Sequence, residues 1–164
     1  MNLDDVENLF EAGPKGVEEW NSKRVAGETI PDLGEVIVCE LELSGVDFSG
    51  LRLVGACFCN ANLDNANFHG ANLRGADLSS VQARHACFIE ADLRDSRFGV
   101  WSLGLGHSGP NADISGADFT RARLARARLD GTYVRDACFD HADLTGVDLP
   151  DTNLSLAKAT NAKR

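Results

Sequence analysis

Histidine, cysteine, aspartate and serine are the side chains in this 164-residue chain that could catalyse a reaction or bind a metal ion. The four histidines are His69, His85, His107 and His141. They lie far apart in the sequence, whereas a zinc site needs about four converging ligands. Asp and Ser are frequent, but no Ser, His and Asp spacing stands out as a catalytic triad. The sequence therefore predicts no enzyme activity, no metal ligand and no cofactor.

The number and spacing of the cysteines indicate that they are reduced thiols of a cytoplasmic protein. There are five, an odd number with no CxxC pair of the kind that binds zinc. The acidic N-terminal stretch MNLDDVENLF does not have the basic and apolar regions of a secretory signal, and no long apolar span predicts a membrane helix. The five residues are Cys39, Cys57, Cys59, Cys87 and Cys138. Cys57 and Cys59 form only a C-x-C pair.

The run TRARLARARLDG at 120–131 is the most conspicuous charged motif, and it is a candidate surface for nucleic acid or an acidic protein. Its arginines are Arg121, Arg123, Arg126 and Arg128. The favoured interpretation is pairing within the protein, because Asp143 and Asp148 follow Arg123 and Arg128 by 20 residues. Residues 51–164 carry equal numbers of acids and bases, so we expect no direct nucleic-acid binding. The net charge of −9 belongs to residues 1–50.

A five-residue repeat must position all of these side chains. Residues 61–80 read ANLDN ANFHG ANLRG ADLSS. A helix would scatter the Leu and Phe residues around its axis, and a continuous strand would place them on alternate faces. The pattern is explained if the chain turns a corner in every repeat. The small residue and the Leu or Phe two positions later then point inward, and the frequent Gly after them suits a tight turn with positive φ.

The spacing of phenylalanines indicates how many repeats make one coil. Phe48, Phe68 and Phe88 lie 20 residues apart, as do Phe119 and Phe139. Four repeats with four corners therefore close a square coil, and stacked coils bury the side chains that a single repeat cannot bury. We expect one column of Phe48, Phe68 and Phe88, and a second of Phe58, Leu78, Phe98, Phe119 and Phe139. The same period makes Cys39 and Cys59 neighbours on adjacent coils.

The A(D/N)LXX pattern over residues 31–161 resembles the pentapeptide-repeat proteins. The resemblance implies an all-β solenoid, a right-handed quadrilateral β-helix with four repeats per coil, and no enzyme activity. Some members of the family inhibit or protect DNA gyrase by presenting a DNA-like rod. The stretch 16–36 is also similar to the segment that precedes the repeats in many bacterial members.

Residues 101–111, WSLGLGHSGPN, interrupt the repeat. Their length equals two repeats and one additional residue, which predicts a one-residue bulge and continues the second phenylalanine column. The alternative is a protruding loop that presents Trp101 and His107 to a partner, since bulges also mark functional sites. Both residues therefore join the four arginines as a candidate partner surface.

Residues 1–30 are expected to form a short helical cap, because a solenoid end exposes core and unpaired backbone. The C-terminal residues show no long amphipathic helix of the kind with which gyrase-targeting members dimerise. We therefore expect a monomer or an end-to-end dimer.

The favoured function is a rigid cytoplasmic scaffold that binds an unknown protein partner, without membrane contact. The alternative is a DNA mimic that modulates or protects DNA gyrase, a type II topoisomerase.

Overall fold

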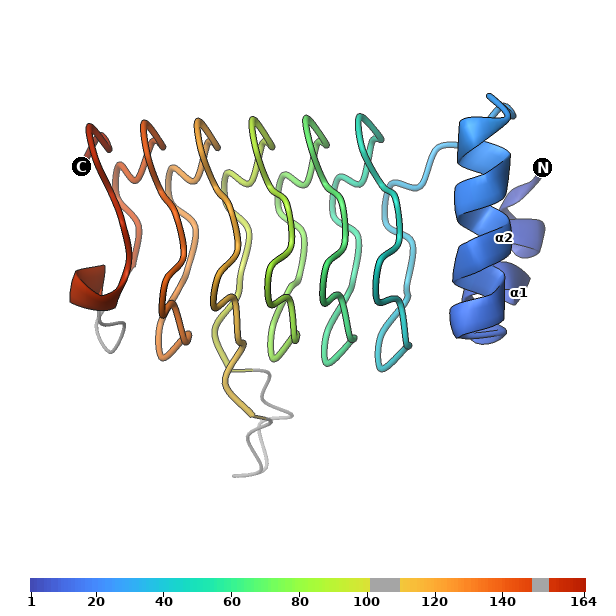
Figure 1. The fold of residues 1–164 in the computed structure, drawn as a ribbon, viewed down its shortest axis with the longest axis horizontal. Coiled ribbons are helices and arrows are strands. Elements are labelled where there is room, and N and C mark those ends of the chain that lie inside the picture. The colour runs from blue at the N-terminus through green and yellow to red at the C-terminus, as the bar shows by residue number, and fades with distance from the viewer. Residues whose placement is uncertain (101–109, 149–153) are drawn as a thin grey trace.

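The computed structural model describes residues 1–100, 110–148 and 154–164. Two helices, α1 (Leu3–Glu11) and α2 (Pro14–Val25), lie at one end of a stack of coils (Figure 1). A short 3-10 helix, η1 (Leu154–Leu156), lies near the C-terminus. In the part of the chain that the structure describes, no helix has the length and apolar character needed to cross a membrane.

Backbone pairing between residues 20 apart builds the coils, so the prediction of four repeats per coil is confirmed. Phe48 N–H, for example, donates to Asn67 O over 2.8 Å, and Asn67 N–H donates to Val46 O over 2.9 Å. The pairs are parallel and isolated, because the chain turns a corner after each of them. The very short strand expected in each repeat is thus reduced to one paired residue.

These paired residues define four faces of the solenoid, named here in chain order. Face 1 carries Ile37, Cys57, Asp77, Arg97, Arg128 and Asp148. Face 2 carries Glu42, Asn62, Gln82, Asp113 and Tyr133. Face 3 carries Asp47, Asn67, Cys87, Asp118, Cys138 and Lys158. Face 4 carries Arg52, Asn72, Asp92, Arg123, Asp143 and Lys163.

The residue types of the repeat each have a local role. Ala66 and Phe68 point inward and are fully buried. Asn67, between them, points outward and accepts a hydrogen bond from His69 N–H through Oδ1 (3.1 Å), which closes the corner as an Asx turn. The corner residue itself is left-handed, with φ of +64° at Gly70. This conformation explains the frequent glycine at the last position of the repeat.

The second phenylalanine column was predicted wrongly. Phe119 stacks on Phe88 with ring centroids 4.7 Å apart, so Phe119 and Phe139 extend the column of Phe48, Phe68 and Phe88. Pairing across the interruption joins residues 31 apart, as in Arg97 with Arg128. The interruption therefore lengthens the register by eleven residues, and the predicted one-residue bulge is wrong. Residues 101–109 of that interruption lie outside the described residues.

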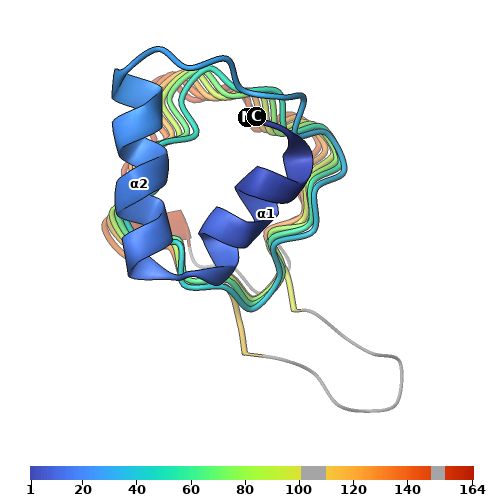
Figure 2. The same cartoon turned by 90° about the vertical axis from the view of Figure 1, so that its right-hand side faces the viewer.

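Helices α1 and α2 lie across the end of the square coil (Figure 2). Phe10 of α1 and Trp20 of α2 are buried, and their ring centroids lie 5.4 and 5.8 Å from that of Phe48 in the first coil. Trp20 Nε1–H also donates to the backbone oxygen of Asp47 over 2.8 Å. The helices thus cover the core and satisfy part of the exposed backbone edge, as required at a solenoid end.

Candidate partner-binding surface

The four arginines of the 120–131 motif do not share one edge of the solenoid. Arg121 and Arg126 occupy left-handed corners, with φ of +59° and +62°. Arg123 lies on face 4 and Arg128 on face 1. The motif therefore wraps around two corners and two faces, because consecutive outward positions of a five-residue repeat lie on consecutive sides of the square.

All four arginines form ion pairs with acids of the protein. Arg126 contacts both carboxylate oxygens of Asp95, at 2.6 and 2.8 Å. The remaining pairs are Arg121 with Glu90 (3.5 Å), Arg123 with Asp92 (3.3 Å) and Arg128 with Asp130 (3.6 Å). The favoured prediction of pairing within the protein is thus confirmed, but the partners are not the predicted Asp143 and Asp148. Asp143 instead contacts Thr145 and Lys163.

These pairs reduce the positive charge that the motif offers to a partner. The hydrogen bond from Arg126 lowers the pKa of the Asp95 carboxyl, which shows that the arginine favours its charged form. Exposed pairs of this kind contribute little to stability, because solvent screens them. Their main effect here is local charge neutrality, which makes the arginine motif a weaker partner surface than its sequence indicates.

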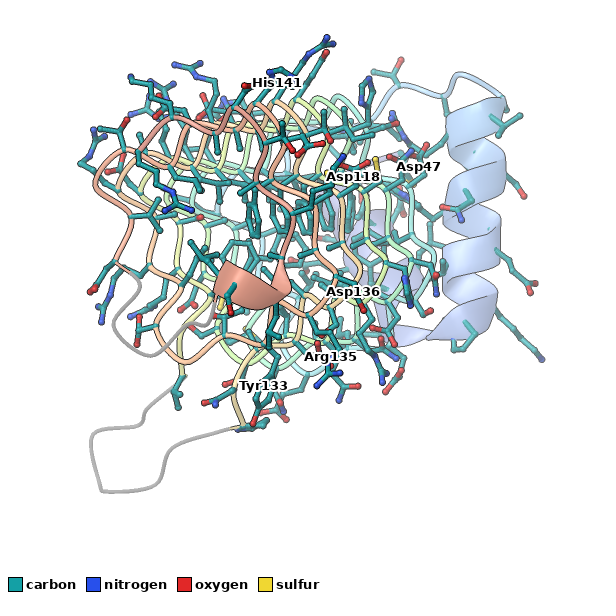
Figure 3. All side chains as sticks on the ribbon, turned by 60° about the vertical axis from the view of Figure 1, so that its left-hand side comes forward. Asp47, Asp118, Tyr133, Arg135, Asp136 and His141 are labelled. Atoms are coloured by element: carbon teal, nitrogen blue, oxygen red, sulfur yellow. The ribbon has the colours of Figure 1, made fainter. Side chains whose placement is uncertain are left out.

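A different surface stands out on face 2. Tyr133 is 58% exposed although it occupies an outward position that is polar elsewhere on this face. Leu156 of η1 is also exposed, and both line a cavity of about 410 Å³. Figure 3 shows Tyr133 close to Arg135 and Asp136. The other lining residues are Asn111, Asp113, Ser115, Gly131, Thr132, Val134 and Arg135.

Sequence reasoning did not single out this surface. The signal was available, since Tyr133 takes the position that Asn or Asp usually takes in the repeat. The contribution of Leu156 to this surface could not be predicted, because η1 replaces the regular repeat there. Trp101 and His107, the two other predicted contact residues, lie outside the described residues.

Three cysteines also come together, and the sequence predicted only part of this group. The Sγ atom of Cys39 lies 2.8 Å from those of both Cys57 and Cys59, and the last two are 2.9 Å apart. The expected proximity of Cys39 and Cys59 is therefore found, with Cys57 as an additional member. Burial raises the pKa of the Cys39 thiol to about 11 and also raises that of Cys59.

His69, His85 and His141 are exposed at separate corners.

The repeats match the family model described as "Pentapeptide repeats" in eight copies, over residues 42–79, 61–99, 111–140 and 137–163. The chain belongs to the pentapeptide-repeat family. Proteins of this family fold as right-handed quadrilateral β-helices, which agrees with the four-repeat coil found here.

Solved structures of other pentapeptide-repeat proteins resemble this one. A pentapeptide repeat protein from the Arabidopsis thaliana thylakoid lumen is 33% identical, with a TM-score of 0.61, over 73% of this chain and 79% of its own. Full-length QnrB1, a plasmid-mediated fluoroquinolone resistance protein, is 19% identical, with a TM-score of 0.39, over 78% of this chain and 67% of its own. Among curated protein sequences, none matches this pentapeptide-repeat protein.

Proposed function

We propose that this pentapeptide-repeat protein is a non-enzymatic scaffold that binds a protein partner at the part of face 2 around Tyr133. The observation that carries the proposal is the exposed Tyr133 ring beside the cavity of about 410 Å³. Tyrosine is enriched in the centres of protein interfaces, where it supplies a large contact area at low cost in conformational entropy.

The position of Tyr133 supports a rigid docking surface. Its backbone is paired with the preceding coil through both polar groups, since Tyr133 N–H donates to Ala112 O and Ile114 N–H donates to Tyr133 O, each over 2.9 Å. Behind it, Val134 is buried in the core. The ring therefore projects from a backbone that is already fixed, so a partner that covers it loses little free energy in ordering this protein.

The test is affinity capture from a lysate of the source organism, with captured proteins identified by mass spectrometry. Tyr133→Asn introduces a residue that other repeats carry at the same position, and should abolish capture of the partner without unfolding the coil. Ile37→Asn is the matched control, because Ile37 is an even more exposed apolar residue (71%) at the same repeat position on face 1. The control should retain the partner.

Equal capture by the wild type and Tyr133→Asn would exclude this surface. Capture of no specific protein by the wild type would contradict the scaffold function itself. Recovery of gyrase subunits would favour the alternative function, modulation of a type II topoisomerase.

A further inference from the structure

The coil geometry brings three thiols to one point beside the N-terminal end. Cys39 and Cys59 hold the same repeat position on adjacent coils, and Cys57 precedes Cys59 by two residues on the same side of the chain. The backbone fixes both coils here, since Val38 N–H donates to Cys57 O (2.8 Å) and Glu40 N–H donates to Cys59 O (2.9 Å). The convergence of the three sulfurs therefore follows from the fold rather than from one flexible side chain.

The number and type of the ligands select a class of metal ion. Thiolates bind soft ions, among them Cu(I) and Zn(II). Within the described residues, the group of His, Cys, Asp and Glu atoms close enough to share one ion consists of these three sulfurs alone. Structural zinc sites take four protein ligands, whereas Cu(I), which soft thiolates select, is also stable with three sulfur ligands in a plane. We propose that Cys39, Cys57 and Cys59 form a three-thiolate site for Cu(I).

The site needs only a small opening to hold an ion. The sulfurs stand 2.8–2.9 Å apart, so each must move outward by roughly 0.6 Å to reach a metal–sulfur distance of about 2.3 Å. Cys39 and Cys57 are half-buried, while Cys59 is buried. Binding replaces the three thiol protons by the ion, and the protons are released to solvent.

The surroundings offer a route to the site and a counter-charge. A cavity of about 230 Å³ between α1 and the first coil is lined by Cys39 and by the carboxyl side chains Glu7 and Glu11, which attract a cation. The Arg97 guanidinium also interacts electrostatically with Cys57 and Cys59 and is paired with Asp77. Because Asp77 already pairs with this arginine, the guanidinium offsets only part of the negative charge of three thiolates around a monovalent ion.

The experiment loads the reduced, full-length protein with Cu(I) supplied as its acetonitrile complex under anaerobic conditions. Copper retained after gel filtration in the presence of a weak Cu(I) chelator is measured by mass spectrometry. We expect one copper per chain, with a sulfur-to-copper charge-transfer band in the ultraviolet. Cys57→Ser should lose the ion and the band. Cys87→Ser is the matched control, at the same half-buried repeat position on face 3, and should retain both.

A second measurement needs no variant and covers the case in which Cys57→Ser fails to fold. Bound Cu(I) should protect Cys39, Cys57 and Cys59 from alkylation while Cys87 and Cys138 react as in the copper-free protein. Alkylation of Cys39, Cys57 and Cys59 that copper leaves unchanged, or copper retention by a folded Cys57→Ser variant, would overturn the site. Retention of Zn(II) but not of Cu(I) in a parallel loading would overturn the assignment of the ion.

Discussion

Phe68 lies in the middle of the aromatic column that supports the coils. Its ring stacks on Phe88 at a centroid distance of 4.9 Å and lies 5.4 Å from Phe48, and the side chain is fully buried. Phe68→Ala removes contacts to two neighbouring coils at once and leaves a cavity. We expect a loss of about 3–5 kcal/mol in the free energy of unfolding, measured by urea denaturation.

His69, the next residue in the chain, provides the control for this prediction. Its side chain is exposed, so His69→Ala should change stability by no more than about 0.5 kcal/mol. An unchanged denaturation midpoint for Phe68→Ala would mean that this ring does not contribute to the core.

Asp140 gives the protein a specific sensitivity to acid. A hydrogen bond from Lys158 lowers the pKa of the Asp140 carboxyl from 3.8 to about 2. Because the pKa is lower in the folded state, the stabilisation is complete above pH 3.8 and is lost as the pH falls towards 2. Asp140→Asn should therefore have a lower urea midpoint than the wild type at pH 6, and the difference should disappear near the folded-state pKa.

The control for this prediction is Asp136→Asn, at an exposed corner near Asp140. It should not reproduce the pH-dependent difference. If Asp140→Asn kept the same difference from the wild type at both ends of the pH range, the carboxylate charge would not be its origin.

The structural role of most positions in the repeat could be predicted from the sequence, because each position has one physical requirement. The preference for glycine at corners agrees with the positive φ found at Gly45, Gly70 and Gly116. The positive φ at Glu40 and Arg126 could not be predicted from the sequence, since neither residue type favours this conformation. Their corners are imposed by the pairing of neighbouring coils, which is a property of the stack rather than of the residue.

Helix α2 depends on one close approach to α1. A Cβ atom added to Gly16 would lie 1.6 Å from the backbone oxygen of Leu9, so no other residue fits without separating the two helices. Gly→Ala at an open helix position usually stabilises by about 1 kcal/mol. Here the sign should reverse, and Gly16→Ala should lower stability by about 1–3 kcal/mol, as overpacked sites do.

Lys15→Ala, at the exposed neighbouring position of α2, is the control and should leave stability nearly unchanged. Thermal unfolding followed by tryptophan fluorescence can compare the two variants, because Trp20 lies in α2 against Phe10. A Gly16→Ala protein that melts at or above the wild-type temperature would show that the helices can move apart without cost.

At the level of elements, the coil was predictable and the register across the interruption was not. The 20-residue period follows from side chains that stack in columns, and any long enough run of repeats displays it. Across residues 101–111 the sequence offered only a length, and that length fitted two repeats and one residue. The observed pairing of Gln82 with Asp113 depends on contacts between coils, which local spacing does not encode.

The whole molecule has a net charge of −9, which belongs to residues 1–50, while acids and bases of the following coils pair with one another. Asp64 pairs with Arg84 at 2.6 Å and Asp77 with Arg97 at 2.5 Å, each pair linking adjacent coils. Asp92 is similarly held, by Arg123 of the following coil. These pairs interrupt any continuous band of negative potential along the described part of the rod. A DNA mimic requires such a band, since it competes through its electrostatic field.

We therefore expect purified protein to change neither the supercoiling activity of gyrase nor its inhibition by a quinolone, even at micromolar concentration. The region most able to contradict this expectation is the acidic N-terminal end, where Glu35, Glu40 and Glu42 are exposed near the first coil. Replacement of all three by Lys is the informative variant. A dose-dependent effect of the wild type that this variant lacks would show that the protein acts on gyrase and that it does so through its negative potential. An effect that survives the charge reversal would instead require a contact through neutral surface, with Tyr133→Asn as the next variant in the same assay.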